Sequence, residues 1–219
     1  MKKRWRSIIL VLLLVVSMTP SMYAKADNED EQEFRVALSL GQGVNDNFEQ
    51  GIKYVSTYGT ASNATQLQQM YMEAGATEMF VRIATKRYND GDTSVDAYHA
   101  ALHNLEVGLE TCEIAASLDI PINPEIMCAY TYMDGNDQQA PDFKDYPEIE
   151  KPDKEWSEYT LEEMCSVLEQ YGELVAEEIL DTGCTVEYWN IGNEANFGFA
   201  GVNVGLETQV NPNLNISKL

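Results

Sequence analysis

Stretches with the pattern of buried strands alternate along this chain with stretches that have the pattern of amphipathic helices, and this order constrains the fold more than any other feature. Strands are expected at 34–40, 79–84, 122–129 and 186–191, and helices at 66–74, 93–116 and 160–181. Thr160 and Glu163 form a capping-box pattern, and Gly75 and Gly183 follow two of the helices as C-terminal stops. The strand–helix–strand order predicts an α/β domain with a parallel sheet and right-handed crossovers.

Residues 1–26 have the features of a secretory signal peptide: basic residues near the start, an apolar run at 8–16 and the small-x-small sequence Ala24-Lys25-Ala26. The apolar run is short for a bilayer span, which favours cleavage over the alternative of an uncleaved membrane anchor. The mature chain is then expected to begin at Asp27, with an acidic leader at 27–33 and the folded domain at 34–219. We therefore expect a secreted bacterial protein that has no stable membrane association after signal cleavage.

The sequence is strongly acidic, with 14 Lys and Arg residues against 36 Asp and Glu residues and a formal net charge of −22. Removal of residues 1–26, which hold five of the basic side chains, changes the balance to 9 − 36 = −27. Such a charge argues against nucleic acid and anionic membrane surfaces as partners. It suits a soluble protein that acts on a neutral ligand.

The four cysteines make no metal-binding spacing such as C-x-x-C. On the expected elements, Cys112 and Cys165 fall on apolar helix faces, Cys128 falls in a strand, and Cys184 falls just before one. Buried free thiols are favoured over disulfides, although export permits disulfides and the sequence fixes no pairing. His99 and His103 lie four residues apart without a third ligand, so a solvated helix face is favoured over a metal site. We expect no metal and no cofactor.

The strongest candidate for chemistry is Asn193-Glu194, which follows the last expected strand. Tyr188-Trp189-Asn190-Ile191 is typical of a short buried strand, and an aromatic, glycine-containing loop follows at 195–201. Functional groups gather at the C-terminal ends of strands in parallel α/β folds, and sugar-cleaving barrels present a proton donor there. The alternative is a strand followed by a loop with an exposed Glu. A charge such as Arg82 inside an apolar strand needs a carboxylate partner or a substrate, so we expect Arg82 and Glu194 to face one pocket.

Aromatic residues accompany this candidate site. The acidic loop at 130–159 is longer than connections in compact domains usually are. Its aromatic side chains suit either stacking on sugar faces or ordinary loop packing, and they are Tyr130, Tyr132, Phe143, Tyr146 and Trp156. We expect Trp189, Phe197 and Phe199 to shape the pocket, and Tyr130 to contact the substrate.

The sequence Trp189-Asn190-Ile191-Gly192-Asn193-Glu194 resembles the fourth-strand motif of clan A glycoside hydrolases, which are (β/α)₈ barrels. It is most similar to the motif of the arabinogalactan endo-β-1,4-galactanase family. Ala140-Pro141, Trp156 and the helix at 160–181 resemble that family's third-strand loop and following helix. Ala74-Gly75-Ala76 resembles its approach to the second strand.

This resemblance extends over residues 34–201 and implies a TIM barrel of which the chain holds about the first four β/α units. It implies that Glu194 is the general acid/base, that Asn193 contacts the sugar and that Arg82 supports the nucleophile. The implied reaction is retaining hydrolysis of plant galactan or arabinogalactan, with a polysaccharide as the substrate.

Two features depart from the family. Met127-Cys128-Ala129-Tyr130 stands where the family has an Asp-Phe-His-Tyr-like sequence with a substrate-contacting His. The family's nucleophile, a Glu on the seventh strand, has no counterpart before Leu219, and a complete barrel typically needs about 250 residues. We therefore expect an N-terminal fragment that is inactive alone. The alternatives are a non-catalytic carbohydrate-binding protein and, with less support, a secreted solute-binding protein of two α/β lobes.

Overall fold

The structure is a computed structural model of the 219-residue chain. It describes residues 34–41, 43–88, 103–130, 133–134, 137–195 and 198–203. The expected signal peptide and leader at 1–33, the start of the expected second helix at 93–102, and Phe197 lie outside the described residues. The account below concerns the unit that begins at Arg35.

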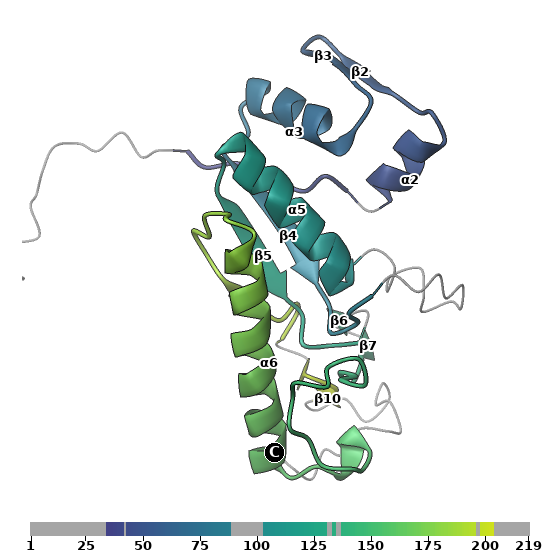
Figure 1. Cartoon of the computed structure of the whole chain (residues 1–219), viewed down its shortest axis with the longest axis vertical. Helices are drawn as coiled ribbons and strands as arrows, with labels where there is room; N and C mark the ends of the chain where they lie inside the picture. The colour runs from purple at the N-terminus through teal and green to yellow at the C-terminus, as the bar shows by residue number, and fades with distance from the viewer. Residues whose placement is uncertain are drawn as a thin grey trace, which may run out of the picture. The chain divides into compact units, whose positions relative to one another are not determined.

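A four-stranded parallel sheet organises this unit (Figure 1). Its strands, in spatial order, are β1 (Ala37–Leu38), β4 (Glu78–Ile83), β5 (Ile122–Ile126) and β8 (Asn190–Ile191). The spatial order equals the sequence order, as in a barrel-type sheet, whereas a doubly wound sheet reverses direction at a switch point. The predicted α/β fold with a parallel sheet is confirmed.

Among the described residues, these strands are connected by the helices α3 (Ala64–Glu73), α5 (Leu105–Leu118) and α6 (Leu161–Asp181). Each begins at a polar cap whose side chain accepts a backbone N–H of the first turn, and the caps are Asn63, Asn104 and Thr160. The Thr160–Glu163 capping box is present as predicted, and it accounts for the start of α6 because it satisfies backbone groups that the helix leaves unpaired. None of the described helices has the length and apolar character needed to cross a membrane.

Shorter elements fill the connections. Between β1 and α3 lie a short helix and a hairpin: α2 (Val44–Glu49), β2 (Tyr54–Ser56) and β3 (Gly59–Ala61). Beyond β5 and β8 lie two small hairpins and a 3-10 turn: β6 (Met133–Asp134), β7 (Asp137–Gln138), η1 (Trp156–Glu158), β9 (Gly198–Phe199) and β10 (Val202–Asn203).

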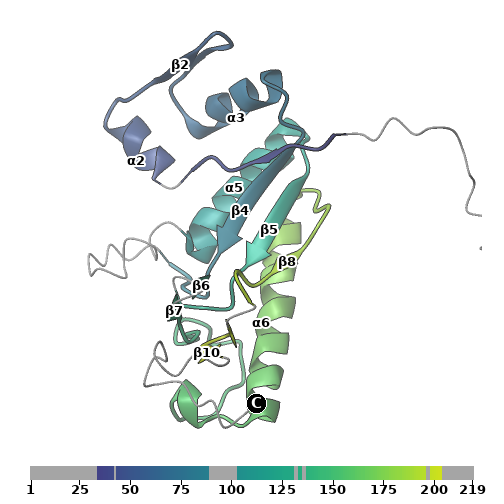
Figure 2. The ribbon, with the colours of Figure 1, turned by 180° about the vertical axis from the view of Figure 1, so that it is seen from behind.

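The two faces of the sheet differ in chemistry. On β4, Met79, Val81 and Ile83 belong to a core shared with α5 and α6. A Cβ added at Gly108 on α5 would lie 2.7 Å from Ile83 Cγ1, so helix and strand are in direct contact. The alternate positions point the other way; they are Glu78, Phe80 and Arg82 on β4 and Asn123 and Glu125 on β5. In the part of the chain that the structure describes, α5 and α6 lie on one face and no helix covers this polar face (Figures 1 and 2).

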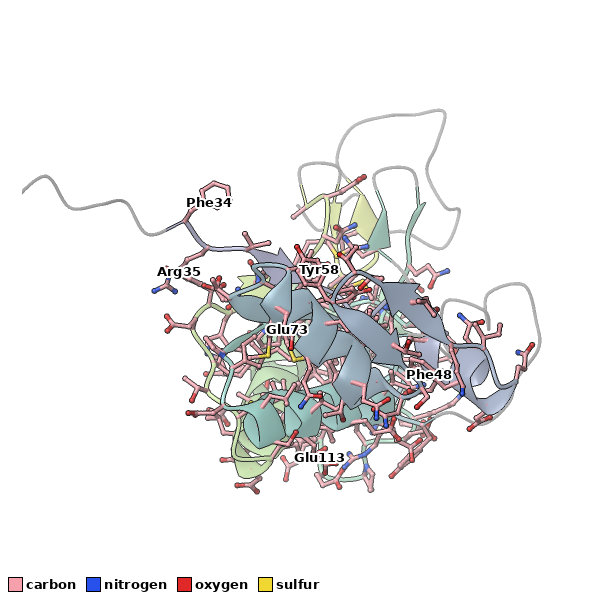
Figure 3. All side chains as sticks on the ribbon, turned by 90° about the horizontal axis from the view of Figure 1, so that it is seen from above. Phe34, Arg35, Phe48, Tyr58, Glu73 and Glu113 are labelled. Carbon is pink, nitrogen blue, oxygen red and sulfur yellow. The ribbon has the colours of Figure 1, made fainter. Side chains whose placement is uncertain are left out.

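Seen with all side chains, the outer surface of the helices is rich in carboxylates (Figure 3). Glu73 on α3 and Glu113 on α5 are examples, and both are exposed. Cys165 on α6 is exposed as well, so its expected place on an apolar helix face is wrong. The acidic composition is thus carried by solvated helix surfaces.

Several predicted strands are shorter than expected. β1 and β8 each hold two residues, and β5 ends at Ile126, so Cys128 lies beyond the strand with a φ of 51°. The prediction that the last strand is buried is wrong, because Tyr188, Trp189 and Ile191 are 54%, 41% and 59% exposed. The physical reason is position: among the described strands β8 pairs with β5 alone and forms an edge of the sheet.

Candidate active site

Glu194 lies just beyond the C-terminal end of β8, at the edge of the sheet where the other parallel strands also end. The Gly192 N–H donates to the Ile126 carbonyl oxygen at 2.7 Å and closes the strand pairing. Gly192 has a φ of 76°, and a Cβ there would meet Phe199 Cε2 at 2.9 Å. The Gly-Asn-Glu sequence therefore starts with glycine because both the backbone conformation and the neighbouring ring exclude a side chain.

Glu194 itself adopts a left-handed backbone conformation with a φ of 49°. For a residue with a Cβ this conformation costs roughly 1–2 kcal/mol. Cys128, at the end of the neighbouring strand β5, has a similar φ of 51°. Non-glycine residues held in such conformations gather at functional sites, so this backbone feature adds to the interest of the exposed Glu194 carboxylate.

Arg82 connects three strands at this end of the sheet. Its Nε lies 2.9 Å from Glu125 Oε1 on β5, and its Nη2 donates to Asn193 Oδ1 at 3.3 Å. Arg82 and Glu125 are paired in the strand register, so the ion pair follows directly from the sheet. Of the two expected partners of Arg82, a carboxylate or a substrate, the structure shows a carboxylate, that of Glu125.

Glu125 is the main residue that the sequence analysis missed. Its side chain is 12% exposed, against 36% for Arg82. Burial raises the pKa of the Glu125 carboxyl above its usual value, and the Arg82 charge opposes that rise. The signal that could have identified Glu125 is a second charge inside an expected buried strand, since two such charges on neighbouring strands can pair.

Asn193 is positioned by contacts with Met133 on β6. Its Nδ2 donates to the Met133 carbonyl oxygen at 2.5 Å, and its backbone N–H contacts Met133 Sδ at 3.4 Å. Met133 belongs to a small apolar cluster at the strand ends, formed with Ala84, Met127 and Ala129. Asn193 contacts this cluster through Met133. The position of Asn193 therefore depends on the packing of Met133 as well as on the hydrogen bond from Arg82.

The other expected site residues are distributed differently. Tyr130 is half-buried, with Lys86 Nζ and Lys144 Nζ at 5.9 and 5.3 Å from its ring centroid. Trp189 lies just before β8 and is 41% exposed, and the next residue, Asn190, is the one that pairs with Glu125. Phe197 lies outside the described residues. Of the expected site residues, the structure joins Asn193 to Arg82 by a hydrogen bond.

Two aromatic residues of the long loop, Phe143 and Tyr146, form part of the core. Phe143 and Tyr146 are buried, and their ring centroids lie 5.3 and 5.5 Å from that of Tyr171 on α6. The Tyr171 hydroxyl donates to the Ala84 carbonyl oxygen at 3.1 Å, next to the end of β4. Of the two expected uses of these aromatics, packing is the one observed for Phe143 and Tyr146.

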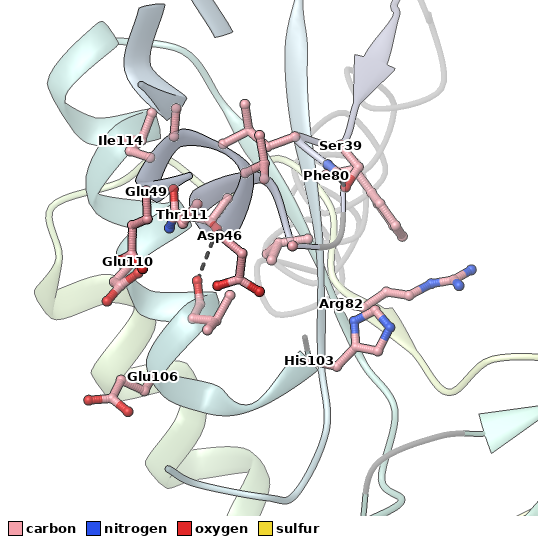
Figure 4. A pocket seen from close by; sticks show the side chains of 18 residues that line it. Ser39, Asp46, Glu49, Phe80, Arg82, His103, Glu106, Glu110, Thr111 and Ile114 are labelled. Carbon is pink, nitrogen blue, oxygen red and sulfur yellow. Dashed lines mark hydrogen bonds between the residues drawn. The ribbon is translucent and has the colours of Figure 1, made fainter. Parts of the chain in front are cut away.

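A cavity of about 580 Å³ lies beside this site, between the segment after β1 and helix α5 (Figure 4). Its polar lining includes Arg82, His103 and the carboxylates of Asp46, Glu49, Glu106 and Glu110. Glu194 is not among its lining residues. The expectation that His103 lies on a solvated helix face is wrong: His103 precedes α5, is 5% exposed, and its carbonyl oxygen accepts from the Ala84 N–H at the end of β4 at 2.6 Å. Among the described residues, no group of three or more His, Cys, Asp or Glu side chains is placed to hold a metal ion.

Comparison with solved structures finds similar folds, among them that of a galactanase. A fungal β-1,4-galactanase of known structure shares the fold with a TM-score of 0.55 and 16% sequence identity. The match covers 75% of this chain and 41% of the galactanase, so the chain spans about two fifths of that protein's length. No family model and no curated protein sequence matches the chain. At this identity the similarity establishes a fold of the TIM-barrel galactanase type and nothing finer.

Proposed function

We propose that this chain carries the acid/base side of a glycoside hydrolase site that acts on β-1,4-galactan, with Glu194 as the proton donor. The observation that carries the proposal is an exposed carboxylate at the C-terminal end of a parallel strand, next to an Asn193 amide that Arg82 fixes. The fold similarity to a galactanase supports the substrate class. The proposal includes export, supported by the signal-peptide pattern at 1–26, and endo action on plant galactan or arabinogalactan.

In a retaining reaction, Glu194 protonates the glycosidic oxygen while the bond to the leaving sugar breaks, and it later removes a proton from the incoming water. A second carboxylate, about 5 Å from the first, attacks the anomeric carbon. Glu125 is unsuited to this attack because its side chain is only 12% exposed, which limits access by a substrate. We assign Glu125 to the support of Arg82, and we assign no nucleophile among the described residues.

Asn193 has the capacity to bind a sugar while it keeps its present hydrogen bonds. A side-chain amide offers two N–H groups and two carbonyl lone pairs. Met133 accepts from the amide nitrogen, and Arg82 donates to the amide oxygen. The second N–H and the second lone pair of Asn193 would then contact a sugar hydroxyl close to Glu194.

The test is cleavage of a β-1,4-linked galacto-oligosaccharide by the full chain with and without sodium azide, since azide can act in place of a carboxylate nucleophile. We expect azide-dependent cleavage, reduced by about 100-fold or more in Glu194→Gln, because a sugar leaving group needs the proton that the general acid supplies. Glu169→Gln, an exposed carboxylate on α6, is the matched control and should retain the wild-type rate.

Galactan binding by the same variants distinguishes the remaining outcomes. Binding without turnover, equal in wild type and Glu194→Gln, would replace the hydrolase proposal with a carbohydrate-binding protein. Turnover that Glu194→Gln leaves unchanged would refute the role of Glu194. Absence of both binding and turnover would refute the galactan proposal as a whole.

A further inference from the structure

The cavity beside the candidate site lies where the chain leaves β1. Only Ala37 and Leu38 of β1 pair with β4, so the later residues of β4 have no partner from β1. Gly41 and Gly43 then have φ values of 85° and 67°, in the left-handed region that favours glycine, and the short helix α2 follows. The space between this segment, β4 and α5 is the cavity of about 580 Å³ (Figure 4).

The lining of the cavity combines groups that suit a neutral ligand with many hydroxyl groups. Asp46, Glu49 and Glu110 provide carboxylate acceptors, and Arg82 provides N–H donors. The ring of the half-buried Phe80 adds an apolar surface. The carboxylates disfavour an anionic ligand by repulsion. The volume of the cavity lies within the range of roughly 300–1,000 Å³ that is typical of small-molecule sites.

Arg82 connects this cavity to Glu194. Its guanidinium carbon lies 5.8 Å from the centroid of the Phe80 ring, and both residues line the cavity. Its Nη2 donates to the side-chain oxygen of Asn193, the residue directly before Glu194. A guanidinium has more N–H groups than the contacts with Glu125 and Asn193 use. A ligand in the cavity can therefore contact Arg82 while another part of the same ligand lies at Asn193 and Glu194.

We propose that the cavity binds further sugar units of a galactan chain whose cleaved bond lies at Glu194. The identity of the sugar rests on the proposed function. Away from Arg82, the cavity is formed by α5 and α2 (Figure 4). Glu110 and Ile114 lie four residues apart and therefore on one face of α5, and Glu49 is the last residue of α2. Hydroxyl groups that donate to these carboxylates make charge-assisted hydrogen bonds, so long galactan chains should bind more tightly than short ones.

The experiment measures binding of β-1,4-galactobiose and β-1,4-galactotetraose to the full chain by isothermal titration calorimetry, without azide so that the ligand is not cleaved. Galactotetraose should bind more tightly than galactobiose. The double variant Glu49→Gln/Glu110→Gln should bind galactotetraose about tenfold more weakly, because a hydrogen bond to a charged group typically contributes at least that much. Glu73→Gln/Glu113→Gln is the matched control: it removes two exposed carboxylates from α3 and α5 that do not line the cavity, and it should bind as the wild type does.

Hydrogen–deuterium exchange of the wild type locates the bound sugar without any variant. Galactotetraose should slow amide exchange in residues 43–49 and 103–114 and leave α6 unchanged. Slowed exchange there together with weaker binding by Glu49→Gln/Glu110→Gln supports the inference, whatever Glu194→Gln does to cleavage. Cleavage that depends on Glu194, with unchanged exchange in these segments or full affinity in the double variant, would overturn the inference and leave the proposed function intact. Failure to bind galactotetraose would overturn the inference whatever the cleavage result.

Discussion

Replacement of Arg82 by Met should destabilise the protein in a pH-dependent way, because it leaves the buried Glu125 carboxylate without its ion-pair partner. Removal of one partner from a buried ion pair costs about 3–5 kcal/mol. Arg82 is 36% exposed and therefore partly screened, which places this pair at the lower limit, about 3 kcal/mol at pH 8. Glu125→Gln should cost less, about 1 kcal/mol, since the remaining Arg82 can regain contact with water.

The pH dependence has a definite sign. In the native protein the pKa of Glu125 is already raised above its ordinary value of 4.5 by burial, and loss of Arg82 raises it further. Between the unfolded and folded pKa values the native state binds more protons than the unfolded state, so stability falls as pH rises through that window. The cost of Arg82→Met should therefore be smaller at pH 5 than at pH 8.

Urea unfolding followed by tryptophan fluorescence at pH 5 and pH 8 measures both effects. The double variant Arg82→Met/Glu125→Gln should be more stable at pH 8 than Arg82→Met alone, since it no longer buries an unpaired charge. Lys154→Met breaks a more exposed ion pair of 2.8 Å with Glu163 and serves as the matched control. Its effect should be small and should change little between pH 5 and pH 8, because the Lys154 ion pair lowers the pKa of Glu163 and the contribution is lost only at lower pH. Equal costs for Arg82→Met at the two pH values would refute the reasoning.

Two further predictions concern helices and use the same urea assay. Thr160→Ala should lower the free energy of unfolding by about 1 kcal/mol because α6 loses its capping box, and Thr160→Ser should retain most of it; an unchanged Thr160→Ala would contradict the cap. Gly108→Ala should cost about 1–3 kcal/mol because its Cβ would lie 2.7 Å from Ile83 Cγ1, whereas Gly172→Ala on α6, with open space around it, should stabilise by about 0.5–1 kcal/mol. Stabilisation by Gly108→Ala would mean that α5 and β4 are less closely packed than described.

The features that the sequence predicted well are those that depend on local chemistry. The limits of α6 follow from a capping box at Thr160 and a glycine at 183, and both signals act within a single turn. The strand at 79–84 was predicted to within a residue at each end because its apolar run is continuous. Neither prediction requires knowledge of a distant contact.

The features that the sequence analysis missed depend on neighbours in space. The need of Arg82 for a carboxylate was evident, but the choice of Glu125 requires the β4–β5 register. The exposure of Trp189 depends on the edge position of β8, and the burial of Cys184 depends on the core that surrounds it. An aromatic residue in a long loop has the same local sequence pattern whether it packs into the core or stays on the surface. Phe143 and Tyr146 illustrate this, because their burial depends on a distant element that packs against them.

The number of paired residues between neighbouring strands of the central sheet decreases from the middle of the sheet to both edges. This number should set the order in which backbone amides exchange with deuterium. β4 and β5 are joined over five register pairs, whereas β1 and β8 are each attached by two. Amides of β5 should therefore exchange slowly, and the Gly192 amide, bonded to Ile126 at the end of β8, should exchange much faster. Glu194 is thus carried by one of the least protected strands, and a sugar held there should be detectable as slower exchange at Gly192.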